Sequence, residues 1–243
     1  MRDNLLLAAI PKDERARLDK FLTQVELENG YVLIEPNGPI ETIYFPIDAV
    51  TSTLQEMSDG SSIESGLMGV EGCIGIQLWL RSQTTPSRTL VQISGQLFKL
   101  KAQDFIREVR DNPKASLNEY IARYTHAFLN MTSTTAACNR LHPIDQRLCR
   151  WLKLTHDRVR RNEFVLRQDF LSSMLGVHRP TISTAANMLQ RAGLITYSRG
   201  NMKILDSEGL REGSCECFEI IEGQFDAIFG RPWRELVRAA DGN

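Results

Sequence analysis

The sequence has no long hydrophobic run, no cysteine framework and almost no net charge. The apolar stretch at residues 5–10 ends at Pro11 and a charged run, so we expect neither a signal peptide nor a membrane span. Five cysteines, an odd number without framework spacing, are typical of reduced thiols in the cytoplasm. The chain also lacks a nucleophile beside a base, a phosphate-binding glycine loop and a metal-ligand pattern. These absences argue against a secreted protein, a membrane protein and an enzyme, and they predict no metal and no other cofactor.

The net charge of −1 conceals an uneven distribution along the 243 residues. Residues 139–205 contain twelve basic and four acidic side chains, a net charge of +8, which leaves −9 for the rest of the chain. A basic segment in an acidic chain suits a DNA-facing module, because neutralisation of phosphates supplies most of the sequence-independent affinity. The same charges are also compatible with a solvated helical face.

Short strands separated by turns are expected between residues 26 and 100. We predict strands at residues 31–34, 42–45, 50–54 and 90–93, with a hairpin turn at Asp59-Gly60. A helical pattern at residues 12–22 precedes them. Regularly spaced short strands predict a barrel or roll with a helix in front of it.

A long helix is predicted after Asn112-Pro113, because proline is favoured in the first turn of a helix. Its apolar side chains repeat at heptad spacing, and such a seam either packs on the chain's own core or joins two helices in a dimer. We favour the dimer, because a long helix between a β-rich domain and a DNA-binding unit suits two-fold recognition of half-sites. The predicted interface consists of Leu117, Ile121, Tyr124, Phe128, Met131 and Thr135.

Residues 168–189 have the pattern of a helix-turn-helix. Two helices that cross at a tight turn need small residues at their contact, a glycine in the turn and buried aliphatic side chains in the second helix. Ser172, Gly176, Ile182 and Ala185 stand at those offsets. Residues 194–205 follow as two short strands around a Gly-Asn turn, which predicts a wing.

The polar side of the second helix is the predicted DNA-reading surface. Arginine binds guanine bidentately and asparagine binds adenine in the major groove, whereas residues at the margins contact phosphates. We assign base contacts to Arg179, Ser183, Thr184 and Asn187 and phosphate contacts to Arg167, Gln168, His178, Thr181 and Arg199.

Residues 166–205 resemble the C-terminal domain of the Crp/Fnr family of bacterial transcription regulators. The resemblance implies an α+β fold: a β-roll (cyclic-nucleotide-binding-like jelly roll) at 1–112, a dimerisation helix at 113–140, a winged helix-turn-helix at 141–210 and a C-terminal helical extension at 211–243. Arg179 matches the family's main base-reading arginine, but Pro180 and Thr184 replace two other base-reading residues, so the operator sequence cannot be carried over. Segments 136–142 and 214–218 resemble a subgroup without a well-defined effector.

The region that matches the family's cyclic-nucleotide pocket departs from its pattern. Ile76 stands where a glutamate binds the ribose in nucleotide-binding members, and isoleucine cannot accept those hydrogen bonds. Arg88 is near the phosphate position, although a lone arginine there is also typical of a surface ion pair. The candidate effector pocket consists of Ile76, Gln77, Arg88 and Thr89, and we do not expect a cyclic nucleotide to bind.

Cys215 and Cys217 are compatible with a metal site or a thiol switch. Two ligands do not fill a tetrahedral site, however, so buried thiols without a chemical role are the simpler interpretation.

Taken together, these patterns predict a sequence-specific, homodimeric DNA-binding transcription regulator in the cytoplasm, with a β-roll for an effector or a partner. Its expected partners are double-stranded DNA, a second copy and RNA polymerase, and no membrane. The alternative is a small-ligand-binding module whose helix-turn-helix is vestigial or serves protein contacts.

Overall fold

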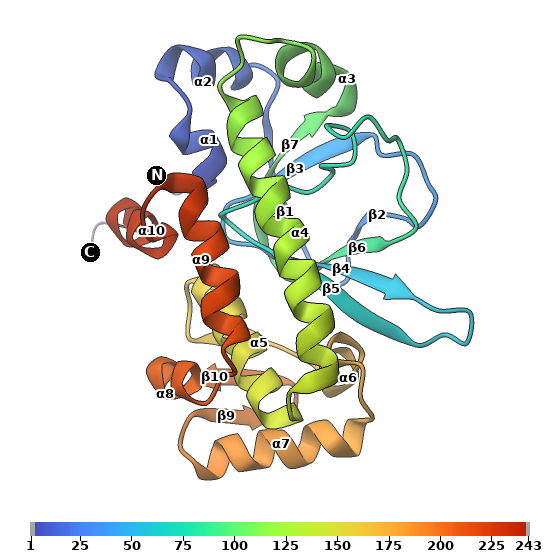
Figure 1. Ribbon diagram of the computed structural model, residues 1–243, viewed down its shortest axis with the longest axis vertical. Coiled ribbons are helices and arrows are strands. Elements are labelled where there is room, and N and C mark those ends of the chain that lie inside the picture. The colour runs from blue at the N-terminus through green and yellow to red at the C-terminus, as the bar shows by residue number, and fades with distance from the viewer. Residues whose placement is uncertain (1–2, 242–243) are drawn as a thin grey trace.

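The N-terminal part of the chain folds as a β-roll. The computed structural model describes residues 3–241, and Figure 1 shows the roll beside a long central helix. Two antiparallel sheets form the roll, with strand orders β1-β7-β3 and β2-β6-β4-β5. The strands are β1 (Thr23–Leu27), β2 (Val32–Ile34), β3 (Thr42–Pro46), β4 (Val50–Glu56), β5 (Ser62–Met68), β6 (Arg88–Ile93) and β7 (Gly95–Lys101). The predicted roll is confirmed.

Short helices flank the roll. Asn4 caps α1 (Leu5–Ala9): its Oδ1 accepts a hydrogen bond from the Leu6 amide at 3.0 Å, and its Nδ2 donates to the Gly72 carbonyl at 2.8 Å. One side chain therefore starts the helix and attaches it to the roll. The helical pattern predicted for residues 12–22 is shorter in the structure, where α2 (Lys12–Leu18) ends before β1 begins. After β7 come α3 (Ala102–Phe105) and a short π-helix, η1 (Ile106–Arg110).

The long helix α4 (Leu117–Leu141) runs from the roll to the C-terminal half of the molecule (Figure 1). Its first amides are capped by an acidic side chain from α2, since the amides of Ser116 and Leu117 donate to the Glu14 carboxylate at 2.9 and 3.1 Å. A carboxylate at a helix N-terminus is favourable because it meets unpaired N–H groups and the positive end of the helix dipole. This contact fixes the helix on the N-terminal part of the chain.

The heptad seam of α4 faces the chain's own core. Tyr124 lies so close to the roll that a Cβ on Gly72 would be 2.3 Å from its ring, and its ring centroid is 6.3 Å from that of Phe225. Phe225 belongs to α9 (Cys217–Phe229), which runs beside α4 (Figure 1). The structure therefore corrects the dimer-interface assignment, because a heptad pattern identifies the apolar side of a helix and not what covers it. The residues concerned are buried or half-buried within one chain: Leu117, Ile121, Tyr124, Phe128, Met131 and Thr135.

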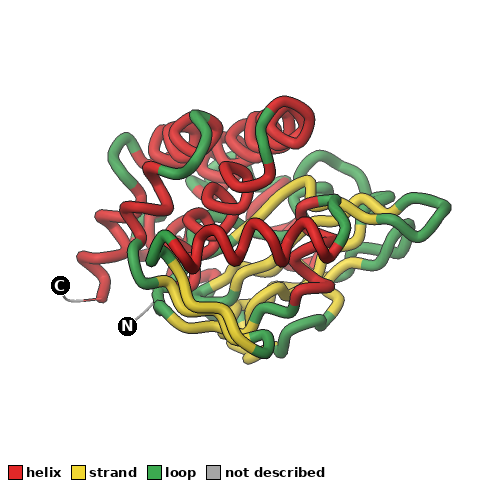
Figure 2. The backbone as a smooth tube through the Cα atoms, turned by 90° about the horizontal axis from the view of Figure 1, so that it is seen from below, coloured by secondary structure: helices red, strands yellow, loops and turns green. Residues whose placement is uncertain are grey.

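The C-terminal half contains a helix-turn-helix and a small sheet. After α5 (Ile144–Val159) come α6 (Gln168–Leu175) and α7 (Arg179–Arg191). The antiparallel sheet β8-β10-β9 consists of β8 (Glu163–Val165), β9 (Ile195–Ser198) and β10 (Asn201–Ile204). Figure 2, seen from below, shows the strands and loops of the roll to one side of the larger helices. The predicted winged helix-turn-helix is confirmed.

The wing turn differs from its prediction by one residue. Asn201 already pairs with Ser198, so Arg199 and Gly200 are the two loop residues. Their φ angles are 50° and 81°, as a two-residue hairpin of the I′ kind requires. The Gly-Asn turn expected from the sequence is therefore wrong, and an arginine takes the left-handed conformation at the tip.

A buried ion-pair junction joins α5, the roll and the C-terminal extension, which consists of α8 (Ser207–Glu212), α9 and α10 (Trp233–Asp241). Arg158 is 0% exposed; its Nε donates to Glu71 Oε1 at 2.7 Å, and its Nη1 lies 3.5 Å from Glu222 Oε1. The guanidinium is 5.3 and 5.2 Å from the ring centroids of Phe225 and Trp233. The three parts of the chain therefore share one buried arginine.

A second buried contact joins β5 to α5. Glu64 Oε1 accepts a hydrogen bond from the Trp151 indole at 3.1 Å, and its Oε2 is 2.7 Å from Ser52 Oγ. Ser52 Oγ also contacts Gln92 Oε1. One hydroxyl proton cannot be donated to two acceptors, so a proton on Glu64 that is donated to Ser52 satisfies the whole chain of contacts.

Candidate nucleic-acid interface

The helix-turn-helix is built on a glycine turn and an apolar contact. Gly176 ends α6 in the left-handed conformation, with φ at 61°, which glycine adopts at little cost. α7 then begins with Pro180 in its first turn. On its inner side Ile182, Ala185 and Leu189 are buried, so the opposite side of α7 is fixed outward.

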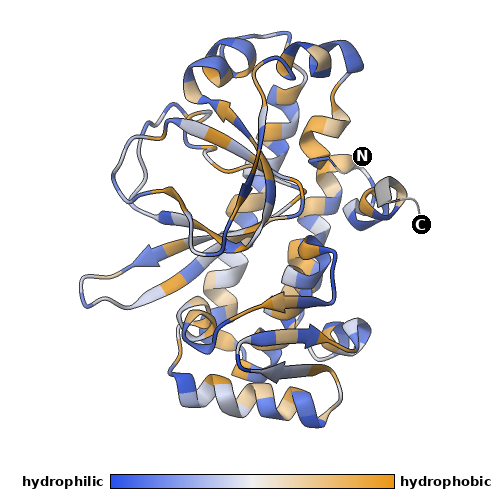
Figure 3. Ribbon diagram, turned by 180° about the vertical axis from the view of Figure 1, so that it is seen from behind, coloured by the Kyte–Doolittle hydropathy of each residue, from blue (hydrophilic) through white to orange (hydrophobic). Residues whose placement is uncertain are grey.

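The outward side of α7 presents the predicted base-contacting residues. Arg179, Thr184 and Asn187 are exposed, and α7 forms the lower edge of the molecule in Figure 1. Ser183 is half-buried, and its Oγ donates to the Arg179 carbonyl at 3.1 Å. Figure 3 shows hydrophilic and hydrophobic residues alternating along this helix. Polar groups on a helix at the molecular edge are accessible to a major groove.

The start of α6, the start of α7 and the wing converge on one basic hollow of about 400 Å³. Arg167 and Gln168 come from α6 and the residue before it, Arg179 from α7 and Arg199 from the wing tip. These four predicted DNA-contacting residues are thus brought together from separate segments. The guanidinium groups of Arg167 and Arg199 on this concave surface are suited to phosphate oxygens.

Asp169 and Tyr197 organise this hollow and were not singled out from the sequence. The Asp169 carboxylate is 2.8 Å from Arg167 Nη2 and 3.7 Å from Arg179 Nη2. Desolvation raises the pKa of Asp169, but hydrogen bonds from Arg167 and the Phe170 amide outweigh it, so the pKa is lowered and the carboxylate stays charged. The Tyr197 hydroxyl donates to a backbone carbonyl, that of Leu166, at 2.7 Å. An acidic residue between two predicted DNA-contacting arginines was the available signal for Asp169.

Comparison with known proteins identifies the same part of the chain. Residues 146–212 match the family model of the Crp-like helix-turn-helix domain. We call this matched segment the Crp-like unit, because it is similar to Crp-like helix-turn-helix domains. The resemblance to Crp/Fnr regulators drawn from the sequence is therefore confirmed. No curated protein matches the sequence.

Three solved structures share the fold of most of the chain. FixK2 from Bradyrhizobium japonicum is 14% identical with a TM-score of 0.64, covering 80% of this chain and 98% of that one. TTHA1359, a CRP/FNR-family regulator from Thermus thermophilus, is 18% identical with a TM-score of 0.62, covering 79% and 98%. The c-di-GMP-responsive regulator CLP from Xanthomonas campestris is 17% identical with a TM-score of 0.60, covering 80% and 99%. The likeness therefore includes the roll as well as the Crp-like unit.

The roll touches the Crp-like unit through the β4–β5 hairpin. A second hollow, of about 580 Å³, lies between this hairpin and the helix-turn-helix and is lined by His178 and Thr181. The contact beside it is close, since a Cβ on Gly176 would lie 2.7 Å from Ile63 Cδ1. His178 and Thr181, predicted to contact phosphates, are exposed but line this second hollow and not the basic one.

The roll interior holds little free space at the predicted effector pocket. Ile76, Gln77 and Thr89 line a cavity of about 10 Å³, roughly the space of a single water molecule. Arg88 does not line this cavity: its guanidinium lies 3.4 Å from Glu35 and 3.2 Å from Glu56. Three of the four predicted effector residues are thus brought together, and the fourth, Arg88, is engaged by two carboxylates instead.

Burial divides the twelve basic residues of segment 139–205. Four of them are buried and cannot contact DNA: Arg147, Arg150, Lys153 and Arg158. Arg160 is half-buried, and the other seven are exposed: Arg140, Arg161, Arg167, Arg179, Arg191, Arg199 and Lys203. The regional charge count therefore overstates the basic surface, because four of the basic side chains are buried along α5.

Within residues 3–241 no helix has the length and apolar character needed to cross a membrane.

Proposed function

We propose that the chain is a sequence-specific transcription regulator that reads double-stranded DNA with the outward side of α7. The observation that supports this most is the convergence of Arg167, Arg179 and Arg199 on one hollow at the start of α7, the helix that also exposes Asn187. Arg179 and Asn187 enter the major groove, where their side chains match guanine and adenine. Arg167 and Arg199 bind phosphates on either side and set the orientation of the helix.

The test is selection of bound fragments from genomic DNA, followed by titration of a selected fragment and a shuffled one at several salt concentrations. We expect tighter binding to the selected sequence and a linear fall of log affinity with log salt. Absent or salt-insensitive binding contradicts the proposal and favours the alternative, a ligand-binding module with a vestigial helix-turn-helix. The 10 Å³ cavity in the roll gives no support to that alternative.

We propose further that two copies associate through the side of α4 that the chain leaves uncovered. His126, Leu129, Ser133 and Ala136 are exposed at spacings that place them along one side of the helix, and Leu129 is 57% exposed. A two-fold pair would present two α7 helices to successive major grooves. Sedimentation equilibrium should show a dimer that Leu129→Arg dissociates, whereas Met57→Arg at the hairpin tip leaves it intact. A monomeric wild type, or a dimer insensitive to Leu129→Arg, contradicts this interface.

The roll, on this proposal, acts without a cyclic nucleotide and serves as an interaction domain, with RNA polymerase as a partner in the cytoplasm. The small cavity and the pairing of Arg88 with Glu35 and Glu56 support the first part. The contact of Ile63 with the Crp-like unit supports a mechanical connection between roll and DNA-reading helix.

A further inference from the structure

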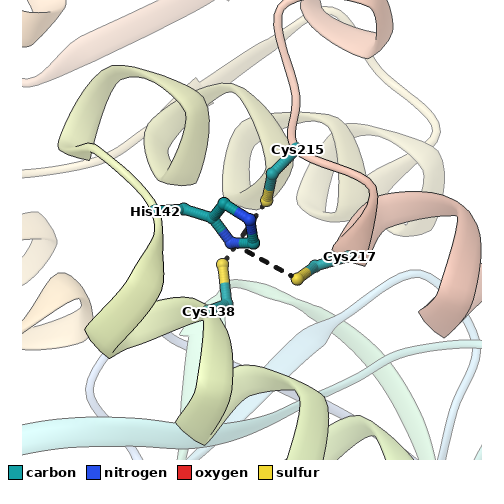
Figure 4. Close-up of side chains that lie close together, drawn as sticks. All are labelled: Cys138, His142, Cys215 and Cys217. Atoms are coloured by element: carbon teal, nitrogen blue, oxygen red, sulfur yellow. Dashed lines mark hydrogen bonds between the residues drawn. The ribbon is translucent and has the colours of Figure 1, made fainter.

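Three cysteines and a histidine meet where the end of α4 contacts the C-terminal extension. Cys138 and His142 lie one turn apart at the end of α4, and Cys215 and Cys217 lie between α8 and the start of α9. The ligand atoms of the four side chains all lie within 4.8 Å of one another, and Figure 4 shows the side chains converging from the two segments. The three cysteines are buried and form a cluster of their own, separate from the main apolar core.

We propose that these four residues bind one Zn²⁺ ion in a closed tetrahedral site. With Zn–S bonds of about 2.3 Å and a Zn–N bond of about 2.0–2.1 Å, ligand atoms in a regular tetrahedron are about 3.5–3.8 Å apart. The Sγ atoms of Cys138 and Cys215 are 3.5 Å apart, and Cys217 Sγ is 3.6 Å from His142 Nδ1. Three thiolates and one imidazole are a donor set that selects Zn²⁺ over the harder divalent metals.

His142 is oriented as a zinc ligand. Its Nδ1 faces the sulfur atoms, while its Nε2 lies 3.2 Å from the Glu216 carboxylate on the other side of the ring. Metal-binding histidines commonly donate their second N–H to a carboxylate, which fixes the tautomer and the ring orientation. Glu216 stands between the two cysteine ligands in the chain, so one short segment supplies two sulfur ligands and the carboxylate that positions the histidine.

Two buried arginines suit the charge of the proposed centre. Binding of Zn²⁺ displaces the thiol protons, so three thiolates, a neutral imidazole and the ion together carry one negative charge. Arg150 lies close enough to act electrostatically on the Cys138 thiol. Arg147 also interacts electrostatically with Cys138 and Cys215. In the described residues neither arginine forms an ion pair with a carboxylate, and a zinc thiolate centre would balance both.

The sequence predicted no metal because only Cys215 and Cys217 were counted as ligands. The fold supplies Cys138 and His142 as well, from the end of α4. None of the four lies within residues 146–212, the part that matches the Crp-like unit. The bound ion would fasten α9 to the end of α4, next to Pro143, where the chain turns from the long helix into α5. It is a structural clamp at the junction with the DNA-reading unit.

The experiment measures metal content in untagged full-length protein purified under reducing conditions. Mass spectrometry of dissolved metals should find about one zinc per chain in the wild type. Cys138→Ser and Cys217→Ser should lose most of it, and both should unfold at lower temperature. Cys73→Ser and Cys149→Ser replace buried cysteines outside the cluster and should retain the zinc. Wild type without zinc, or equal zinc in all variants, overturns the proposal.

Cobalt substitution tests the site without relying on a variant that folds. Apo protein prepared with a strong chelator and loaded with Co²⁺ should show the intense visible bands of a tetrahedral thiolate site, and Zn²⁺ should abolish them. His142→Asn should alter these bands while thiolate-to-cobalt absorption persists. An octahedral cobalt spectrum, or a Cys138–Cys215 disulfide in protein purified without air, overturns the zinc site in favour of surface binding or a thiol switch. Neither readout depends on DNA binding, so the two proposals can fail separately.

Discussion

The arginines of α5 and those of the helix-turn-helix differ in what surrounds them, although they lie in the same basic segment. Arg158 is enclosed by two carboxylates and two aromatic rings. Arg179 is 67% exposed at the side chain and has only a 3.7 Å ion pair with Asp169. A guanidinium with buried partners stabilises the fold, whereas an exposed one is free to bind an anion. Charge in a sequence therefore becomes a binding surface only where the fold leaves it unpaired.

The largest expected effect is at the buried arginine. Arg158→Met leaves Glu71 without its cation and leaves Glu222 with Arg234 alone, and loss of one partner of a buried pair costs about 3–5 kcal/mol. Urea unfolding should show this loss of stability. The matched control is Arg161→Met, an exposed residue nearby in the chain, which should change stability by less than about 0.5 kcal/mol. Equal stability of the two variants would show that the junction does not stabilise the fold.

The next effect is a pH dependence of stability that arises at Glu64. Burial raises its pKa from 4.5 to about 7, although the charges of Arg150 and Arg158 and the hydrogen bond from Trp151 act in the opposite direction. The folded state then binds a proton that the unfolded state has lost, so stability falls as pH rises from about 4.5 to about 7. The shift corresponds to about 3 kcal/mol. Unfolding free energies measured from about pH 5 to about pH 8 should show this fall.

Glu64→Gln is the control for this titration, because its amide can donate to Ser52 as the protonated acid does. The variant should lose part of the pH dependence and retain the part due to Glu222, whose pKa burial also raises to about 7. An unchanged slope in Glu64→Gln would place the titration elsewhere.

A smaller effect, on DNA affinity alone, is expected at the exposed arginine. Arg179→Ala should cost about 1–3 kcal/mol and relax specificity at one base pair, because its guanidinium reads a base edge. Arg167→Ala should weaken binding to all sequences alike and reduce the salt slope by about 1. Fluorescence anisotropy with a selected operator and its single-base variants separates the two. Intact sequence preference in Arg179→Ala would contradict the groove assignment.

No effect is expected from cyclic nucleotides. The 10 Å³ cavity cannot admit one without rearrangement, and Arg88 is paired with Glu35 and Glu56. Thermal unfolding with cyclic AMP and cyclic GMP should leave the melting temperature unchanged, since only a ligand that binds the folded state raises it. A rise at low ligand concentration would show that the roll opens and that Ile76 does not prevent binding.

Local patterns predicted the elements well, because helix period and turn chemistry depend on neighbouring residues. The helix-turn-helix follows from Gly176 and the apolar residues of α7, and α4 follows from its heptad repeat. The strand β5 was not named because Glu64 and Gly66 interrupt its apolar pattern. Both are buried for reasons that lie far along the chain, in Trp151 and Phe128 respectively.

Long-range partners account for what the sequence did not show. The seam of α4 displays an apolar side, but its cover, α9, comes from the end of the chain. In the same way Cys138 and His142 have the one-turn spacing of a ligand pair, yet nothing local connects them with Cys215 and Cys217. The residues of the basic hollow could be predicted from the sequence, but its shape could not. Asp169 pairs with Arg167 and Arg179, and these come from two segments that meet only in the fold.

Ile63, in strand β5 of the roll, contacts Gly176 in the turn that leads into α7. The size of this one side chain therefore influences the angle between α7 and the roll. A Cβ at position 176 would lie 2.7 Å from Ile63 Cδ1, so the two segments are in close contact at this point. A bulkier residue at position 63 would tilt the helix-turn-helix, and a smaller one would let it settle toward the roll. If two copies pair as proposed, such a tilt would change the separation of the two α7 helices and with it the number of base pairs between half-sites.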